Sequence, residues 1–370
     1  MELSLEKNHG LVVLSFFLIP TVMLIVGYIL FPYPPSLLAR QLSFLPLFLG
    51  LILLGIGFFY KRKSTAGMLK VIGWGLFAFF WATMPGFLYY SEGGDVFNGA
   101  VCVIGVYVLI YMGYHEWLSL KRDTYVSCLN WIAGGTFLAG IIYFTIENGI
   151  IPGLKDWLIE NVAAQSADVL HLFGINALRS QDLIVYNNVP VTIIFACTAI
   201  QSMVLFVGMI GALSRVNLKR KALGLLVTVV PVYFLNLIRN ASVVYMVGSG
   251  MFSFEMAHNV IAKTGSLLAL IMLLFITFKI VPELYDEIIG IVDLAKRKGP
   301  VELFFGRLLG KKHDAHRYGW FFLASRIVCV YVCINYRLIL LQRLLADFFS
   351  GCFCLFLFNI LSFNRFFSGS

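Results

Sequence analysis

Three residues of types suited to acyl-transfer chemistry stand in separate apolar stretches of the chain. Cys197 follows Val-Thr-Ile-Ile-Phe-Ala, Arg239 interrupts Asn-Leu-Ile-Arg-Asn, and His258 precedes a third apolar stretch. A thiolate is a nucleophile, and histidine can accept the thiol proton and return it to a leaving amine. Arginine stays protonated, so it is no base, but it can pair with a thiolate or stabilise an oxyanion. Together these residue types predict a cysteine acyl-transfer site.

Each of the three residues also has an ordinary structural explanation. A lone cysteine in an apolar helix is more often a small packing residue. An arginine there can pair with a carboxylate, but the stretch around Arg239 offers none, and the cost of burying its charge favours a functional role. His258 is equally explained as a histidine at the membrane interface. His171 is a second candidate base, and Lys263 can simply extend its ammonium group to the membrane surface.

The composition is typical of a protein that crosses a membrane several times. Hydrophobic residues make up 60% of the 370 residues and charged residues 13%, which is more apolar surface than a soluble core needs. The net charge of +9 comes from Lys and Arg in short loops between apolar stretches, a pattern that orients membrane proteins and argues against a nucleic-acid partner. The seven cysteines have no spacing typical of a zinc site, and no metal or organic cofactor is expected.

The apolar pattern predicts an all-α fold, a polytopic membrane bundle of about eight transmembrane helices. The expected spans are residues 11–31, 42–60, 68–90, 97–114, 125–146, 191–213, 222–247 and 259–281. Basic clusters follow the second, fourth and sixth spans, so the positive-inside rule puts both ends of the bundle in the cytoplasm. The longest loop, 147–190, is then extracellular. Residues 156–178 within it have helical apolar spacing, and we expect them either to lie flat on the outer surface or to cap the bundle as a connector.

Three regions differ in composition. Residues 1–283 hold all the spans and are expected to form the catalytic membrane domain. Residues 284–312 are amphipathic and basic, and they are expected to form a cytoplasmic extension. Residues 313–370 are rich in Phe, Cys and Arg, with charges scattered through apolar runs in a way that bundle helices rarely tolerate. We assign no function to this last segment.

The predicted topology brings the three side chains to similar depths below the outer face of the membrane. At 1.5 Å per residue, Cys197 lies about 9 Å below the outer end of its span, and Arg239 lies about 12 Å below the end of the next one. His258 lies at the outer start of the last span. The predicted site therefore faces the extracellular side of the cell membrane.

Further polar residues are expected to support this site. Asn236, Arg239 and Asn240 share a helical face by their i,i+3 and i,i+4 spacing. A second polar strip consists of Cys197, Thr198, Gln201 and Ser202. Such residues within spans face a bundle interior or a water-filled cavity. Pro231 is expected to bend its helix and widen that cavity.

With these residues in view, the chain resembles the archaeosortases of the exosortase/archaeosortase superfamily, over roughly residues 1–310. The resemblance rests on Ala-Cys-Thr-Ala-Ile-Gln-Ser at 196–202, Asn-Leu-Ile-Arg-Asn at 236–240, His-Asn at 258–259, and the spacing between these blocks. In length and number of spans the chain is most similar to the A-type members. It departs from the family at Ala199, where a glycine is common, and the third position is either His or Arg across the superfamily.

The resemblance implies a membrane transpeptidase that acts on secreted or surface-layer proteins. Their C-terminal sorting signal consists of a short motif (Pro-Gly-Phe for the A-type), a hydrophobic helix and a basic tail. The enzyme cuts near the motif and joins the new C-terminus to a membrane lipid. By motif match, Cys197 is the nucleophile, Arg239 stabilises the transition state, and His258 takes the third position.

The sequence is also compatible with three other functions. An intramembrane cysteine protease differs only in using water as the acyl acceptor. A transporter would use Arg239 as an anion site, and this predicts inverted repeats or broken helices, which the sequence does not display. A non-catalytic scaffold predicts that loss of the Cys197 thiol has no effect.

Overall fold

The computed structural model describes residues 9–60, 62–90 and 96–308, without the side chain of Phe97. The segment 313–370 and the end of the predicted extension lie outside the described residues. The chain divides into two compact units, one from Met1–Phe137 with Asp286–Gly369 and the other from Leu138–Tyr285. We describe each unit by itself.

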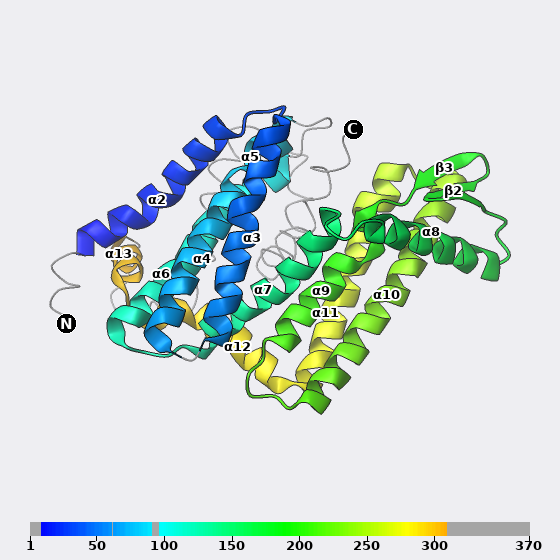
Figure 1. The fold of residues 1–370 in the computed structure, drawn as a ribbon. Helices are drawn as coiled ribbons and strands as arrows, with labels where there is room; N and C mark the ends of the chain where they lie inside the picture. Colours follow the sequence, from blue (N-terminus) through cyan, green and yellow to red (C-terminus); the bar gives the residue numbers. More distant parts are fainter. Residues whose placement is uncertain (1–8, 61, 91–95, 309–370) are drawn as a thin grey trace. The chain divides into compact units, whose positions relative to one another are not determined.

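The first unit is a set of packed helices (Figure 1). In chain order they are α2 (His9–Leu30), α3 (Leu37–Phe59), α4 (Lys63–Ala82), α5 (Met84–Tyr90), α6 (Val96–Arg122), the first part of α7 (Ser127–Glu147), most of α12 (Pro282–Val292), a 3₁₀ turn (Asp293–Arg297) and α13 (Pro300–Leu308). Glycines let α3 and α4 approach closely, since a Cβ atom on Gly73 would lie 3.0 Å from the carbonyl oxygen of Gly50. Small residues at such contacts are typical of helices packed in a membrane.

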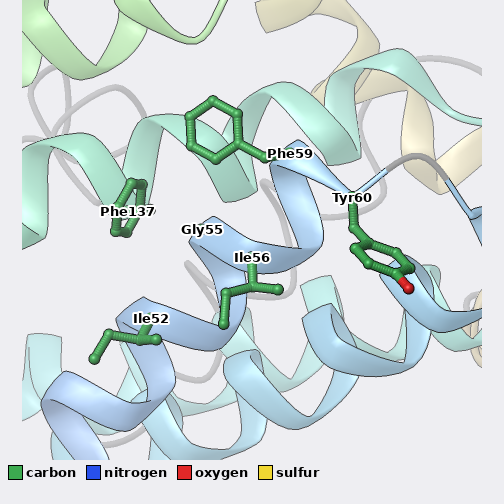
Figure 2. Close-up of a pocket in the computed structure, with 6 residues that line it drawn as sticks. All are labelled: Ile52, Gly55, Ile56, Phe59, Tyr60 and Phe137. Carbon is green, nitrogen blue, oxygen red and sulfur yellow. The ribbon is translucent and has the colours of Figure 1, made fainter.

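An apolar groove of about 420 Å³ lies on this first unit (Figure 2). Its lining residues come from α3, the residue after it, and α7: Ile52, Gly55, Ile56, Phe59, Tyr60 and Phe137. The groove contains none of the residues that the sequence predicts for the site.

Residues 286–308 pack against α6 through polar contacts. The Glu302 carboxylate lies 3.2 Å from His115 Nε2 and accepts a hydrogen bond from the Tyr114 hydroxyl at 3.2 Å. Arg297 donates to the His115 carbonyl at 3.2 Å and to Ser119 Oγ at 3.1 Å. These contacts tie the amphipathic stretch to the membrane helices of the first unit.

A buried ion pair joins α4 to α6. Lys70 Nζ lies 2.8 Å from Glu116 Oε1, and the two side chains are 7% and 4% exposed. Lys70 also donates to Asn130 Oδ1 of α7 at 3.3 Å. Removing one partner of such a pair leaves the other charge buried without compensation.

We therefore expect Lys70→Met to lower the free energy of unfolding by about 3–5 kcal/mol. The double variant Lys70→Met/Glu116→Leu should recover most of this loss, because it leaves no unpaired charge. Thermal unfolding of the purified protein in detergent measures both effects. The matched control is Lys296→Met, which breaks an exposed pair with Asp293 and should change the midpoint little. Equal losses in the single and double variants would contradict the prediction.

The second unit combines helices with a small sheet (Figure 1). In chain order it contains the rest of α7, α8 (Leu154–Leu172), β1 (Leu178–Ser180), β2 (Leu183–Tyr186), β3 (Val189–Thr192), a 3₁₀ turn η1 (Phe195–Thr198), α9 (Ile200–Gly211), α10 (Leu218–Gly248), a π-helical turn η2 (Met256–Ala262) and α11 (Lys263–Ile280). Helix α10 packs against α8, α9 and α11. The strands form an antiparallel sheet in the order β1-β2-β3.

The prediction of a helical, multi-pass membrane fold is confirmed. Within the described ranges, seven helices are long and apolar enough to cross a membrane: His9–Leu30, Leu37–Phe59, Lys63–Tyr90, Asn98–Arg122, Ser127–Glu147, Leu218–Gly248 and Met256–Ile280. The expected helix at 156–178 is present as α8, although it ends at Leu172. The sidedness of the bundle stays a prediction.

The prediction of a span over residues 191–213 is wrong for its first half. This region contains the end of β3, then η1, and only then α9, whose 12 residues are fewer than the roughly 20 that cross a bilayer. The run Val-Pro-Val-Thr-Ile-Ile is rich in β-branched residues, which suit a strand as well as an apolar helix. Asn187 and Asn188, with φ values of 50° and 63°, make the tight turn that pairs β3 with β2.

Candidate active site

Cys197 lies in a tight turn at the start of α9 and not within an α-helix. Its backbone N–H donates to the carbonyl of Ile194 at 2.7 Å, and Thr198 Oγ1 donates to the carbonyl of Phe195 at 2.7 Å. Ala199 then has φ 60° and ψ 1°, which is left-handed backbone. The prediction that Cys197 to Ser202 form one helical strip is therefore wrong, and the helix from which the depth of Cys197 was derived is absent at residues 191–199. The side chain of Cys197 is 6% exposed and packs in the apolar core of the second unit.

Two asparagines of α10 hold the Cys197 carbonyl. Asn236 Nδ2 donates to this oxygen at 2.6 Å, and Asn240 Nδ2 donates to it at 2.9 Å. Both asparagines are buried, and their i,i+4 spacing puts them on one face of the helix, as the sequence predicts. Because the 3₁₀ turn breaks the helical ladder, these amides provide partners for a carbonyl that its own helix does not satisfy.

Arg239 is connected to the Cys197 turn through Asn240. Its guanidinium Nη1 donates to Asn240 Oδ1 at 3.2 Å, while Asn240 donates to the Cys197 carbonyl. Arg239 is half-buried, so its charge is partly shielded from water. The chain Arg239–Asn240–Cys197 brings a fixed positive charge close to the thiol-bearing residue.

His258 lies in the π-helical turn η2, at the start of the last long helix. Its ring stacks on Phe254 with centroids 5.1 Å apart and planes 9° from parallel. The positive charges of Arg239 and Lys263 interact electrostatically with this ring. Turns of this kind inside helices are frequent at functional sites. The sequence did not predict the π-helical turn.

The structure thus assembles most of the predicted residues around α10. Asn236 and Asn240 both donate hydrogen bonds to Cys197. Arg239 donates a hydrogen bond to Asn240, and its charge interacts electrostatically with His258. In the part of the chain that the structure describes, no hydrogen bond joins the thiol to His258 or Arg239.

Two of the other three residues of the predicted strip, Thr198 and Gln201, have structural partners, and so does the second candidate base, His171. Thr198 closes the turn on Phe195, and Gln201 Nε2 donates to the Tyr143 hydroxyl at 2.9 Å. The Nε2 atom of His171 lies 2.8 Å from the carbonyl oxygen of Ala177 and is engaged there.

Two residues near the turn were missed from the sequence. Tyr143, which contacts Gln201, donates its hydroxyl to Glu147 Oε1 at 2.9 Å. The signal available in the sequence was a glutamate one helical turn after a tyrosine, at the end of an apolar stretch. In sequence, however, Glu147 looked like the polar end of a span, and nothing local connects it to Gln201.

The small sheet packs beside the Cys197 turn within the second unit. β1 and β3 are edge strands, and their unpaired backbone groups are not tolerated in hydrocarbon. The sheet packs on the end of α10, where the Tyr186 and Tyr245 rings lie 6.0 Å apart and Asn187 Nδ2 donates to the Gly248 carbonyl at 3.2 Å. Since β3 leads into η1, Cys197 packs in the same apolar cluster as Ile184 and Val191 of the sheet.

Ala199 has a backbone conformation that favours glycine. An L-residue in the left-handed region is strained, and glycine is not. We expect Ala199→Gly to raise the free energy of unfolding by about 0.5–1 kcal/mol, because the relieved strain exceeds the added entropy of the unfolded chain. Ala212→Gly is the matched control, since Ala212 has ordinary right-handed φ and ψ of −75° and −9°, and it should destabilise the protein. Thermal unfolding measures both changes, and the same sign in both would refute the prediction.

Comparison with known proteins agrees with the helical membrane fold. The model of the transmembrane exosortase family matches residues 14–278. Archaeosortase A of Haloferax volcanii is 24% identical over 267 residues, which covers 62% of this chain and 85% of that protein. Archaeosortase A of Natronomonas pharaonis is 27% identical over 276 residues, which covers 63% of this chain and 81% of that protein. No solved structure matches the chain at a significant level. The family match spans all the residues of the site, and the chain therefore belongs to the transmembrane exosortase family as an archaeosortase-like member.

Proposed function

We propose that this protein is a membrane cysteine transpeptidase that sorts secreted or surface-layer proteins. It removes a C-terminal signal of the Pro-Gly-Phe type and transfers the new C-terminus to a membrane lipid. The observation that carries the proposal is the buried turn at Cys197, whose carbonyl is held by two asparagines on either side of Arg239 in sequence. The similarity to two proteins named archaeosortase A supports the same function.

The first half-reaction forms a thioester. The Cys197 thiol gives its proton to His258 through water, and the sulfur attacks the carbonyl carbon of the scissile bond. Arg239 stabilises the negative charge that develops on the carbonyl oxygen. When the intermediate collapses, the C–N bond breaks and His258 returns the proton to the leaving amine.

The second half-reaction resolves the thioester. A hydroxyl group of a lipid headgroup attacks the thioester carbonyl, its proton passes to His258, and the Cys197 thiolate leaves and is reprotonated. A site enclosed by α10 and the sheet limits competition from water, which favours transfer over hydrolysis. The distribution of basic loops supports a site at the extracellular face. The substrate helix enters from the membrane and brings its motif to that face.

The test is the fate of a reporter protein in cells that lack an endogenous sorting enzyme. The reporter carries a Pro-Gly-Phe motif, a hydrophobic helix and a basic tail, and its C-terminus is followed by intact-mass spectrometry with and without this protein. A control reporter has Ala-Ala-Ala in place of the motif. We expect loss of the tail and gain of a lipid mass only with the intact motif and this protein present. Loss of the tail without lipid would indicate a hydrolase, and an unchanged reporter would contradict the proposed function.

A further inference from the structure

A buried polar network connects α7 to the first turn of α9. The Tyr143 hydroxyl donates to Glu147 Oε1 at 2.9 Å and accepts from Gln201 Nε2 at 2.9 Å. These three side chains are 0%, 2% and 5% exposed. Gln201 is the second residue of α9, shortly after the Cys197 turn, so the network reaches the chain on the C-terminal side of the nucleophile.

Tyr143 also contacts the chain on the N-terminal side of Cys197. Its ring packs on Phe195, with centroids 5.7 Å apart and planes 35° from parallel. Phe195 is the first residue of the 3₁₀ turn and Gln201 lies in the first turn of α9, so one tyrosine holds both ends of the segment that carries Cys197. The asparagines of α10 hold the middle of this segment through the Cys197 carbonyl.

Glu147 sets the direction of the hydrogen bonds around Tyr143. Because the Tyr143 hydroxyl donates its hydrogen bond to Glu147, the lone pairs of the tyrosine oxygen are free to accept from Gln201. The Lys155 ammonium, which lies 5.7 Å from the centre of the Phe195 ring, also interacts electrostatically with Glu147. Glu147 thus fixes Tyr143 as the acceptor of the hydrogen bond from Gln201.

A short 3₁₀ turn followed by a left-handed residue has few bonds of its own to keep it in one conformation. Attack on a carbonyl requires the sulfur to be held to within about 0.5 Å. We propose that Tyr143 and Glu147 are positioning residues for the nucleophile, which act through Phe195 and Gln201 and do not touch the substrate. The catalytic part of this inference rests on the proposed function, whereas the fixing of the turn does not.

The first experiment measures access to the Cys197 thiol. The full chain in detergent is treated with N-ethylmaleimide, and the alkylation rate at Cys197 is followed by peptide mass spectrometry. Tyr143→Phe keeps the ring and removes the hydroxyl, and we expect the rate to rise at least about threefold because the loosened turn opens a buried thiol. Tyr233→Phe is the matched control, since it removes a tyrosine hydroxyl that binds Gln165 in the same unit at 2.8 Å. It should leave the rate unchanged.

The second experiment measures the rate of signal removal from the reporter. We expect Tyr143→Phe to lower this rate by about ten- to a hundredfold, since small displacements of a reacting group have effects of this size. Glu147→Gln keeps an oxygen that accepts from Tyr143 and should remain close to wild type in both assays. Glu147→Leu removes the acceptor and should behave like Tyr143→Phe.

These outcomes separate the inference from the proposed function. If Tyr143→Phe matches Tyr233→Phe in both assays, or if Glu147→Gln is as impaired as Glu147→Leu, the positioning role is overturned. If Cys197→Ala still processes the reporter, the proposed function fails, yet the alkylation rate still tests the fixing of the turn. If Tyr143→Phe yields no folded protein, Gln201→Met breaks the same contact from the other side and must show the same rise in alkylation.

Discussion

Cys197→Ala is expected to abolish removal of the C-terminal signal, with a loss of at least about 10³-fold in rate. Without the sulfur no thioester forms, and no other residue of the turn supplies a nucleophile of comparable strength. Alanine fits the buried site that the cysteine occupies, so we expect the amount of protein in the membrane to stay unchanged. Intact-mass spectrometry of the reporter, at matched expression, measures the effect.

Two further variants make this prediction specific. Cys197→Ser keeps the shape of the side chain but replaces the thiol by a much weaker nucleophile, so it should also be inactive. Cys128→Ala removes another cysteine, which is 5% exposed within α7, and it should process the reporter at the wild-type rate. Normal processing by Cys197→Ala would disprove the nucleophile assignment and favour a scaffold or a transporter.

Arg239→Gln is expected to lower the rate of signal removal by about 10²–10³-fold. The guanidinium is the fixed positive charge next to the turn, and glutamine can still bond to Asn240 but carries no charge. Arg239→Lys keeps the positive charge but loses the planar array of N–H donors of the guanidinium group, so we expect a rate between those of the wild type and Arg239→Gln. Pulse-labelling of the reporter, followed over time, gives the three rates.

The control for Arg239 is another arginine of the same helix. Arg220 forms an ion pair with Glu283 at 2.7 Å, far along α10 from the asparagines, and Arg220→Gln should leave the processing rate within about twofold. Thermal unfolding of each variant shows whether a loss of processing rate comes from a loss of folded protein. A loss of rate in Arg239→Gln that merely follows a fall in the amount of folded protein would contradict a role in the transition state.

Hydropathy and length were sufficient to predict the long membrane helices, because a lipid-exposed backbone must satisfy its own hydrogen bonds. They failed at residues 191–199, where short apolar runs suit a strand, a turn or a helix equally well. The choice there is made by distant parts of the chain. Asn236 and Asn240 supply the donors that the Cys197 carbonyl lacks in a turn, and they follow it by some 40 residues. No local pattern around Cys197 contains that information.

The same limit separates the site residues that the sequence identified from those that it missed. Cys197 and Arg239 stood out because thiol and guanidinium groups are unusual in apolar stretches. Tyr143 and Glu147 did not, since a tyrosine and a glutamate near the end of a span are common interfacial residues. Their link to the turn depends on Gln201, which is 58 residues after Tyr143 in the chain.

The buried ion pair between α4 and α6 also has a consequence for how the protein is made. Lys70 leaves the ribosome before Glu116, so α4 enters the membrane with an ammonium group that has no carboxylate partner. A lysine near the end of a helix can extend to the interface during that interval, and its pairing marks the arrival of α6. The charge of Lys70 is therefore compensated only after α6 has been synthesised, and a chain truncated before Glu116 would keep an ammonium group without its carboxylate partner.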